Sequence, residues 1–161
     1  MYNLTIEQVK ELAKDYSIIP LVTEVRGDMD TPISVFKRMA AEKECFLLES
    51  IGDSLVTARY SFIGRNPFLM FSGTGSDMEI RYFDGRTEKK PGRPMEELER
   101  LVNMYRAPEL ADIPSFSGGA VGFFAYDIIR QYEDLPNVNE DDLKLPDLHF
   151  MFTDEIIAFD H

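Results

Sequence analysis

The sequence predicts an α+β fold built from amphipathic helices and antiparallel strands. Apolar residues recur at helical spacing in three segments, and they alternate with polar residues in several others. Short turns such as Asp84-Gly85 join the alternating segments, as is typical of antiparallel hairpins. A chain of 161 residues with 44% hydrophobic content has the size of one globular domain. Such a chain can bury a core without a disulfide or a structural metal.

Three helices are expected from their starting signals. Thr5-Ile6-Glu7-Gln8 has the pattern of a capping box and predicts the first helix. Thr31 followed by Pro32 predicts the start of the second, and Pro94 predicts the start of the third. In the third helix an apolar stripe of Met95, Leu98, Leu101, Val102 and Tyr105 is expected opposite a charged face of Glu96, Glu97, Glu99 and Arg100.

Seven strands are expected from alternating or continuous apolar residues bounded by turn signals. They are 21–25, 45–49, 60–64, 67–72, 78–83, 148–152 and 156–159. The strands between 60 and 83 are interpreted as an antiparallel meander. The glycine-rich, aromatic stretch 116–127 is too apolar for a linker and predicts a further, buried strand where backbones approach closely.

Charge and cysteine content limit the possible partners. The net charge of −12 weighs against a nucleic-acid surface, which needs clustered Lys and Arg. The local basic excess beside Asp84-Gly85 is interpreted as a charged hairpin edge. Cys45 is the single cysteine, so no disulfide can form within the chain, and a reducing, cytoplasmic location is expected. We expect no membrane association, because no apolar run approaches about 20 residues.

Catalytic and phosphate-binding motifs are not recognisable. A P-loop requires Lys followed by Ser or Thr after its last glycine, whereas Phe123 follows Gly122. Cys45 lies inside an apolar strand, where a thiol is usually inert. His149 and His161 have no nucleophile or ligand set beside them in the pattern and are expected to be structural. A stand-alone enzyme is therefore the weakest hypothesis.

The strand 45–49 is the strongest candidate for a binding site. It is apolar until it ends on Glu49 and Ser50, and ligands often bind where a buried strand leaves the core. The residues alone leave two interpretations open. Glu49 and Arg59 could bind the charged groups of a small zwitterion, or Ser50 could cap a turn while Glu49 is solvated and Arg59 pairs with a surface acid.

Four motifs resemble anthranilate synthase component I, in the family's order and spacing. They are Phe46-Leu47-Leu48-Glu49-Ser50, Arg59-Tyr60-Ser61-Phe62-Ile63-Gly64, the stretch 116–127, and Asp147-Leu148-His149-Phe150-Met151-Phe152 with Phe159-Asp160-His161. The resemblance runs from about Ile19 to His161 and identifies residues 1–161 as the N-terminal, regulatory region of a chorismate-utilising enzyme. Leu48-Glu49-Ser50 favours the anthranilate branch.

The resemblance implies an activity that this region does not carry alone. The family enzyme converts chorismate and ammonia, delivered by a glutamine amidotransferase subunit, to anthranilate and pyruvate. Its chorismate, Mg²⁺ and acid/base residues lie in a C-terminal region that this chain lacks, so no cofactor is expected here. The implied fold is an α/β/β/α sandwich of orthogonal antiparallel sheets, incomplete in this chain. Its uncovered strands are expected to favour self-association.

The resemblance also implies one side of a feedback site for L-tryptophan. Ser50 corresponds to the serine that contacts the inhibitor, with Leu48, Glu49 and Arg59 beside it. A zwitterionic amino acid needs an acceptor for its ammonium group, a donor for its carboxylate and an apolar slot for its side chain, and these residues could supply them. Two alternatives are aminodeoxychorismate synthase component I and a free-standing amino-acid-binding module.

Overall fold

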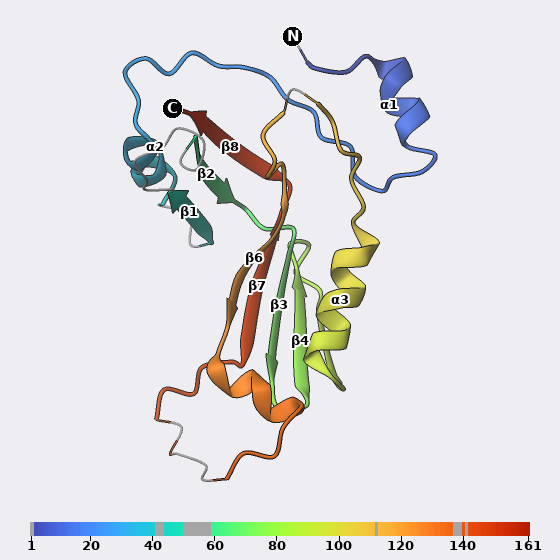
Figure 1. Cartoon of the computed structure of the whole chain (residues 1–161), viewed down its shortest axis with the longest axis vertical. Coiled ribbons are helices and arrows are strands. Elements are labelled where there is room, and N and C mark those ends of the chain that lie inside the picture. The colour runs from blue at the N-terminus through green and yellow to red at the C-terminus, as the bar shows by residue number, and fades with distance from the viewer. Residues whose placement is uncertain (1, 41–43, 50–58, 112, 137–139, 141) are drawn as a thin grey trace.

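The computed structural model describes all residues except 1, 41–43, 50–58, 112, 137–139 and 141. The described residues form an α+β fold with two antiparallel sheets, as the sequence predicts. The helices are α1 (Ile6–Leu12), α2 (Pro32–Met39), α3 (Pro94–Met104) and the 3₁₀ helix η1 (Tyr126–Gln131). Of these, α2 lies beside the small sheet and α3 beside the large sheet (Figure 1).

The small sheet has the strand order β1-β2-β8. Its strands are β1 (Cys45–Glu49), β2 (Tyr60–Arg65) and β8 (Glu155–Asp160). Helix α2 contacts both β1 and β2. Ile63 of the central strand is fully buried, whereas β1 lies at an edge and buries only Phe46 among its residues. The interpretation of 45–49 as a buried strand is therefore wrong.

The large sheet has the strand order β5-β4-β3-β7-β6. Its strands are β3 (Leu69–Thr74), β4 (Asp77–Tyr82), β5 (Thr87–Pro91), β6 (Gly119–Phe124) and β7 (Leu148–Thr153). One face packs against α3 and forms the main core of Leu69, Phe71, Met78, Ile80, Leu98, Leu101, Leu148, Phe150 and Phe152. The expected meander is confirmed for β3 and β4, and β5 continues it, but β2 belongs to the other sheet.

Two short strand-to-strand connections join the sheets. Residues 66–68 lead from β2 to β3, and Asp154 alone separates β7 from β8. Arg65 pairs with Glu155, and the Phe68 amide donates to the Phe152 carbonyl at 2.9 Å, so the two connections lie side by side.

The predicted helix starts are confirmed by their capping bonds. The Thr5 amide donates to the Gln8 side chain at 2.8 Å, and the Gln8 amide donates to the Thr5 hydroxyl at 3.3 Å. Thr31 and Ser34 form the same reciprocal pair at the start of α2, where Pro32 occupies the first helical position. These bonds satisfy amides that have no partner within the helix.

The buried stripe of α3 is rotated relative to the prediction. Glu97 is only 8% exposed, although it was expected on the charged face, and Val102 is 48% exposed. Glu97 can be buried because Lys90 Nζ lies 2.9 Å and Arg100 Nη2 lies 2.6 Å from its carboxylate.

Two further expectations are wrong. Residues 21–25 form no strand. The stretch 116–127 does contain β6, but among the described residues this strand pairs with β7 alone and lies at an edge of the sheet, with Phe123 and Phe124 44% and 48% exposed. The close backbone approach expected there is confirmed, because a Cβ at Gly122 would lie 2.0 Å from the His149 carbonyl oxygen.

Candidate functional site

The predicted binding residues lie at one end of the small sheet. Leu48 and Glu49 are the last residues of β1, and Arg59 directly precedes β2. Because β1 and β2 pair antiparallel, the end of one strand lies beside the start of the other. The structure thus brings Leu48, Glu49 and Arg59 to the same end. Ser50 lies outside the described residues.

Leu48 and Glu49 belong to opposite faces of the small sheet, because side chains alternate along a strand. Leu48 pairs with Phe62, and Glu49 pairs with Ser61. Each therefore shares a face with its partner, and the end of the sheet has an apolar face and a polar face.

An aromatic row lies on the face of Leu48. The ring centroids of Tyr60 and Phe62 are 5.8 Å apart, and those of Phe62 and Phe116 are 5.4 Å apart. Phe116 also contacts Phe46 at 6.3 Å. Leu48, next to this row, is 42% exposed. The row and Leu48 form an apolar surface of the kind against which an aromatic ligand can pack.

Arg59 is held by a carboxylate from β8. Its Nε donates to Asp160 Oδ1 at 2.7 Å, and its Nη2 donates to Asp160 Oδ2 at 2.6 Å. The guanidinium carbon also lies 4.8 Å from the centre of the Tyr60 ring. Hydrogen bonding to Arg59 holds the pKa of Asp160 below its ordinary value, and the same bond raises the pKa of Arg59. Both ions therefore remain charged through the neutral range.

A second bond connects β2 to the residue after β8. Ser61 is 2% exposed, and its Oγ lies 2.8 Å from Nε2 of His161. The His161 amide donates to the Arg59 carbonyl at 2.9 Å, which extends the β2–β8 ladder beyond Asp160. The polar face of this end therefore carries Glu49, Ser61 and His161, and its backbone is fixed by hydrogen bonds.

These groups have the chemistry needed to bind part of a zwitterionic aromatic amino acid. The exposed Glu49 carboxylate can accept from an ammonium group, and Arg59 can donate to a carboxylate. The aromatic row can contact a ring. Arg59 and the row share one face of the sheet, and Glu49 lies on the other, so a ligand that meets all three would lie across the end of the sheet. A partner surface would have to complete the pocket.

Sequence patterns did not reveal Asp160, His161 or the aromatic row as neighbours of this cluster. The alternation of side chains along a strand does predict that Tyr60 and Phe62 lie on one face, so this part of the aromatic row could have been found from the sequence. Asp160 lies 101 positions after its partner Arg59, and His161 lies 100 positions after its partner Ser61. No local sequence pattern predicts such a distant pairing.

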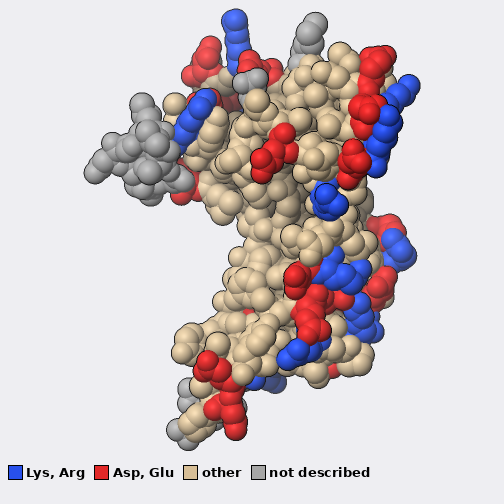
Figure 2. All heavy atoms as spheres, turned by 45° about the vertical axis from the view of Figure 1, so that its right-hand side comes forward, with Lys and Arg blue, Asp and Glu red and all other residues tan. Residues whose placement is uncertain are grey.

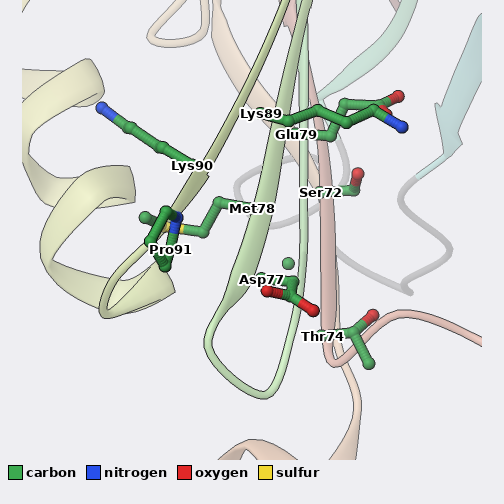
Figure 3. A pocket seen from close by; sticks show the side chains of 9 residues that line it. Ser72, Thr74, Asp77, Met78, Glu79, Lys89, Lys90 and Pro91 are labelled. Atoms are coloured by element: carbon green, nitrogen blue, oxygen red, sulfur yellow. The ribbon is translucent and has the colours of Figure 1, made fainter.

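A groove of about 440 Å³ lies on the large sheet. It is lined by Ser72, Gly73, Thr74, Asp77, Met78, Glu79, Lys89, Lys90 and Pro91 (Figure 3). Its cations already have anionic partners, since Lys89 pairs with Glu79 at 2.8 Å and Lys90 pairs with Glu97 at 2.9 Å. Figure 2 shows acidic and basic residues interleaved along the side of the molecule that carries α3. The charges here are of both signs and do not form a site of one sign.

Among the residues that the structure describes, no three His, Cys, Asp or Glu side chains converge as metal ligands would. None of the helices in this part of the chain has the length and apolar character needed to cross a bilayer.

Comparisons with known proteins agree with the motifs. The chain is 48% identical over its whole length to anthranilate synthase component 1 from Acetivibrio thermocellus and covers 33% of that protein. It is 33% identical over 163 residues to anthranilate synthase component 1 from Mycolicibacterium smegmatis, with 96% of this chain and 30% of that protein covered. No family model matches the chain.

A solved structure shares the fold. The crystal structure of anthranilate synthase component I from Streptococcus pneumoniae TIGR4 matches with a TM-score of 0.52 and 27% sequence identity. The match covers 87% of this chain and 29% of that chain. The chain thus spans about a third of the length of the relatives it matches. Its sequence and its α+β fold together confirm the resemblance to anthranilate synthase component I, of which this chain corresponds to about one third.

Proposed function

We propose that the chain is the N-terminal, regulatory part of an anthranilate synthase component I. In complete form this cytoplasmic enzyme would convert chorismate and ammonia, supplied by a glutamine amidotransferase subunit, to anthranilate and pyruvate in tryptophan biosynthesis. The proposal is supported by similarity along the whole chain to proteins of that name. The isolated chain is expected to be inactive, because chorismate would bind to the part of the protein that lies beyond it.

We propose further that the end of the small sheet is one side of an L-tryptophan feedback site. Leu48, Glu49, Ser50 and Arg59 would contact the inhibitor. The observation that carries this proposal is the placement of Leu48, Glu49 and Arg59 at one sheet end, beside a half-buried aromatic row. Glu49 would accept from the ammonium group, and the row would contact the indole.

We propose that the magnesium ion of the complete enzyme binds in the part of the protein beyond this chain. The described residues provide no converging set of three acidic, His or Cys ligands. Carboxylate oxygens are the usual protein ligands of Mg²⁺. The proposed L-tryptophan site does not depend on the metal.

The bare β6 edge supports the view that the fold is incomplete in this chain. Its exposed Phe123 and Phe124 and its single pairing partner leave backbone groups available to another strand. We propose that the remaining two thirds of the complete protein cover this edge and complete a layered sandwich.

The binding proposal can be tested by titrating the chain with L-tryptophan. The protein contains no Trp, so fluorescence anisotropy reports the ligand alone. The same titration would be made on a fusion of this chain to the remaining two thirds of the Acetivibrio thermocellus relative. Glu49→Ala and Ser50→Ala test the site, and Glu88→Ala and Ser76→Ala, on or beside the distant β4–β5 hairpin, are matched controls.

We expect saturable binding by the fusion protein that is lost in Glu49→Ala and Ser50→Ala and kept in the controls. Binding by the isolated chain would show that the half-site is preformed, and would favour a free-standing module if the fusion binds no more tightly. Absence of binding in both proteins would refute the feedback site. The product formed from chorismate by the fusion protein distinguishes anthranilate synthase from aminodeoxychorismate synthase.

A further inference from the structure

We propose that Asp160 is a positioning residue of the regulatory site: its carboxylate fixes the Arg59 guanidinium over the Tyr60 ring, on the face of the small sheet that carries Leu48. The inference rests on the proposed function and adds a residue to it. Asp160 would act through Arg59 and would not itself contact L-tryptophan.

The first support is the geometry of the Arg59–Asp160 pair. Both carboxylate oxygens accept, one from Nε at 2.7 Å and one from Nη2 at 2.6 Å. A two-point fork fixes the direction of a guanidinium as well as its distance, which a single bond does not do. The Arg59 side chain is 57% exposed, so few other contacts would restrict its rotamers. The Nη1 nitrogen takes no part in the fork and is the group that would meet the ligand carboxylate.

Tyr60 provides a second constraint on the same guanidinium. The Arg59 Cζ atom lies 4.8 Å from the centre of the Tyr60 ring, within the range of a cation–π contact. The Tyr60 ring also lies beside Phe62 at 5.8 Å, at the start of the aromatic row. A guanidinium held here lies next to the apolar surface proposed for the indole, so one ligand could reach both.

The backbone fixes Asp160 in turn. Asp160 is paired with Tyr60 in the β2–β8 ladder, and the next residue, His161, donates its amide to the Arg59 carbonyl at 2.9 Å. Ser61 and His161 then join their side chains at 2.8 Å. Bonds on both sides of Asp160 therefore define its place relative to Arg59, which is the arrangement expected of a residue that orients another.

The opposite end of the same two strands offers a matched control. Arg65 pairs with Glu155 across β2 and β8, and Arg65 Nε donates to Glu155 Oε2 at 3.1 Å. This pair has the same chemistry and joins the same strands, but lies at the far end of the ladder from Leu48 and Glu49. If the ion pairs only stabilised strand pairing, removal of either pair would have the same effect. If Asp160 positions the regulatory site, only its replacement should weaken ligand binding.

The test compares L-tryptophan affinity in three variants of the fusion protein. Asp160→Asn should weaken binding roughly tenfold, the lower end of the loss seen when a group that orients a metal ligand is removed. Asp160→Glu, which keeps the carboxylate, should recover most of the affinity. Glu155→Gln should bind like the unmodified protein. Thermal unfolding of all variants shows whether a loss of affinity reflects a loss of folded protein.

The Nε–H proton of Arg59 gives a readout that needs no ligand. Its NMR signal should be protected from exchange in the unmodified chain and in Glu155→Gln, and it should exchange faster in Asp160→Asn. Unchanged affinity in Asp160→Asn, or an equal loss in Glu155→Gln, would overturn the inference while leaving the feedback site intact. No binding by the unmodified fusion protein would overturn both.

Discussion

Gly122 of β6 lies against the backbone of His149 in β7, with no room between them for a side chain. A Cβ atom on Gly122 would lie 2.0 Å from the His149 carbonyl oxygen and 2.7 Å from the Phe150 Cα atom. Both neighbours are backbone atoms of a paired strand, so they cannot rotate away. The contact explains why a glycine occupies the middle of this strand.

Gly122→Ala should destabilise the chain, because β6 must move away from β7 to admit a methyl group. Overpacking of this kind typically costs about 1–3 kcal/mol. Urea unfolding followed by circular dichroism measures the change. Gly27→Ala is the control, because the nearest atom to its new Cβ would be the Asp30 Cβ at 3.9 Å, an ordinary contact. Equal stability of the two variants would contradict the contact.

His149 should make the chain less stable in mild acid. Burial lowers the pKa of its imidazole, and the charge of Arg81 lowers it further, so protonation disfavours the folded state. Below the ordinary histidine pKa of about 6.5, the unfolded state binds more protons, and the free energy of unfolding falls with falling pH.

Replacing His149 by Gln should remove this contribution. Urea unfolding between about pH 7.5 and pH 5.5 would show a smaller loss of stability in His149→Gln than in the unmodified chain. Ser72→Ala is the control, because Ser72 pairs directly with His149 and does not titrate. An identical pH dependence in His149→Gln and the unmodified chain would disprove the role of His149.

Glu97→Gln should loosen the attachment of α3 to β5. The carboxylate accepts from Arg100 and Lys90, and the pKa of Glu97 is lowered first by hydrogen bonding to Arg100. Because both cations are partly exposed, the expected loss at neutral pH is about 1–2 kcal/mol. The loss should shrink as the pH falls, since protonation of Glu97 removes the same charge.

Glu96→Gln serves as the control for this prediction. Glu96 lies on the same helix and pairs with Arg93 at 2.6 Å, but both side chains are mostly exposed. Its replacement should change the free energy of unfolding by less than about 0.5 kcal/mol. A loss in Glu96→Gln as large as that in Glu97→Gln would contradict a special role for the buried carboxylate.

The isolated chain should self-associate through β6. The other edge strand, β5, carries Glu88, Lys89 and Lys90 and ends at Pro91, all of which discourage strand addition. The β6 edge has no charge and no proline. Light scattering should show a mean mass that rises with concentration.

Phe123→Lys should reduce this self-association, since a charge on an edge strand opposes pairing with another chain. Phe83→Lys makes the same exchange at a residue that is 78% exposed and lies between β4 and β5, so it should behave like the unmodified chain. A fully folded chain that stays monomeric at high concentration would refute the prediction.

Local signals predicted local structure well. The capping residues Thr5 and Thr31 and the turn at Asp84-Gly85 act within a few positions of chain, and each appears as expected. The limits of β1 were also predicted, because its apolar run is bounded by polar residues on both sides. Residues 21–25 had a strand-like composition but pair with no strand among the described residues, so composition alone misled.

Features that depend on residues far apart in the sequence could not be predicted from it. The rotated stripe of α3 depends on Lys90 from β5, without which Glu97 would face water. The candidate site shows the same limit. Sequence placed Leu48, Glu49 and Arg59 together, but the fork between Arg59 and Asp160 follows from β8 pairing with β2, which no periodicity encodes.

The two short connections between the sheets define how the molecule can deform. Asn66, which has a φ of 48°, begins the three-residue link from β2 to β3, and Asp154 is the one-residue link from β7 to β8. The ring of Pro67 fixes the φ angle of one residue in the first link, and both links are short. Rotation of the small sheet relative to the large sheet would therefore use an axis through Asn66 and Asp154. The Arg59–Asp160 pair lies at the opposite end of β2 and β8 from this axis. A small rotation about the axis would therefore displace this end of the small sheet the most.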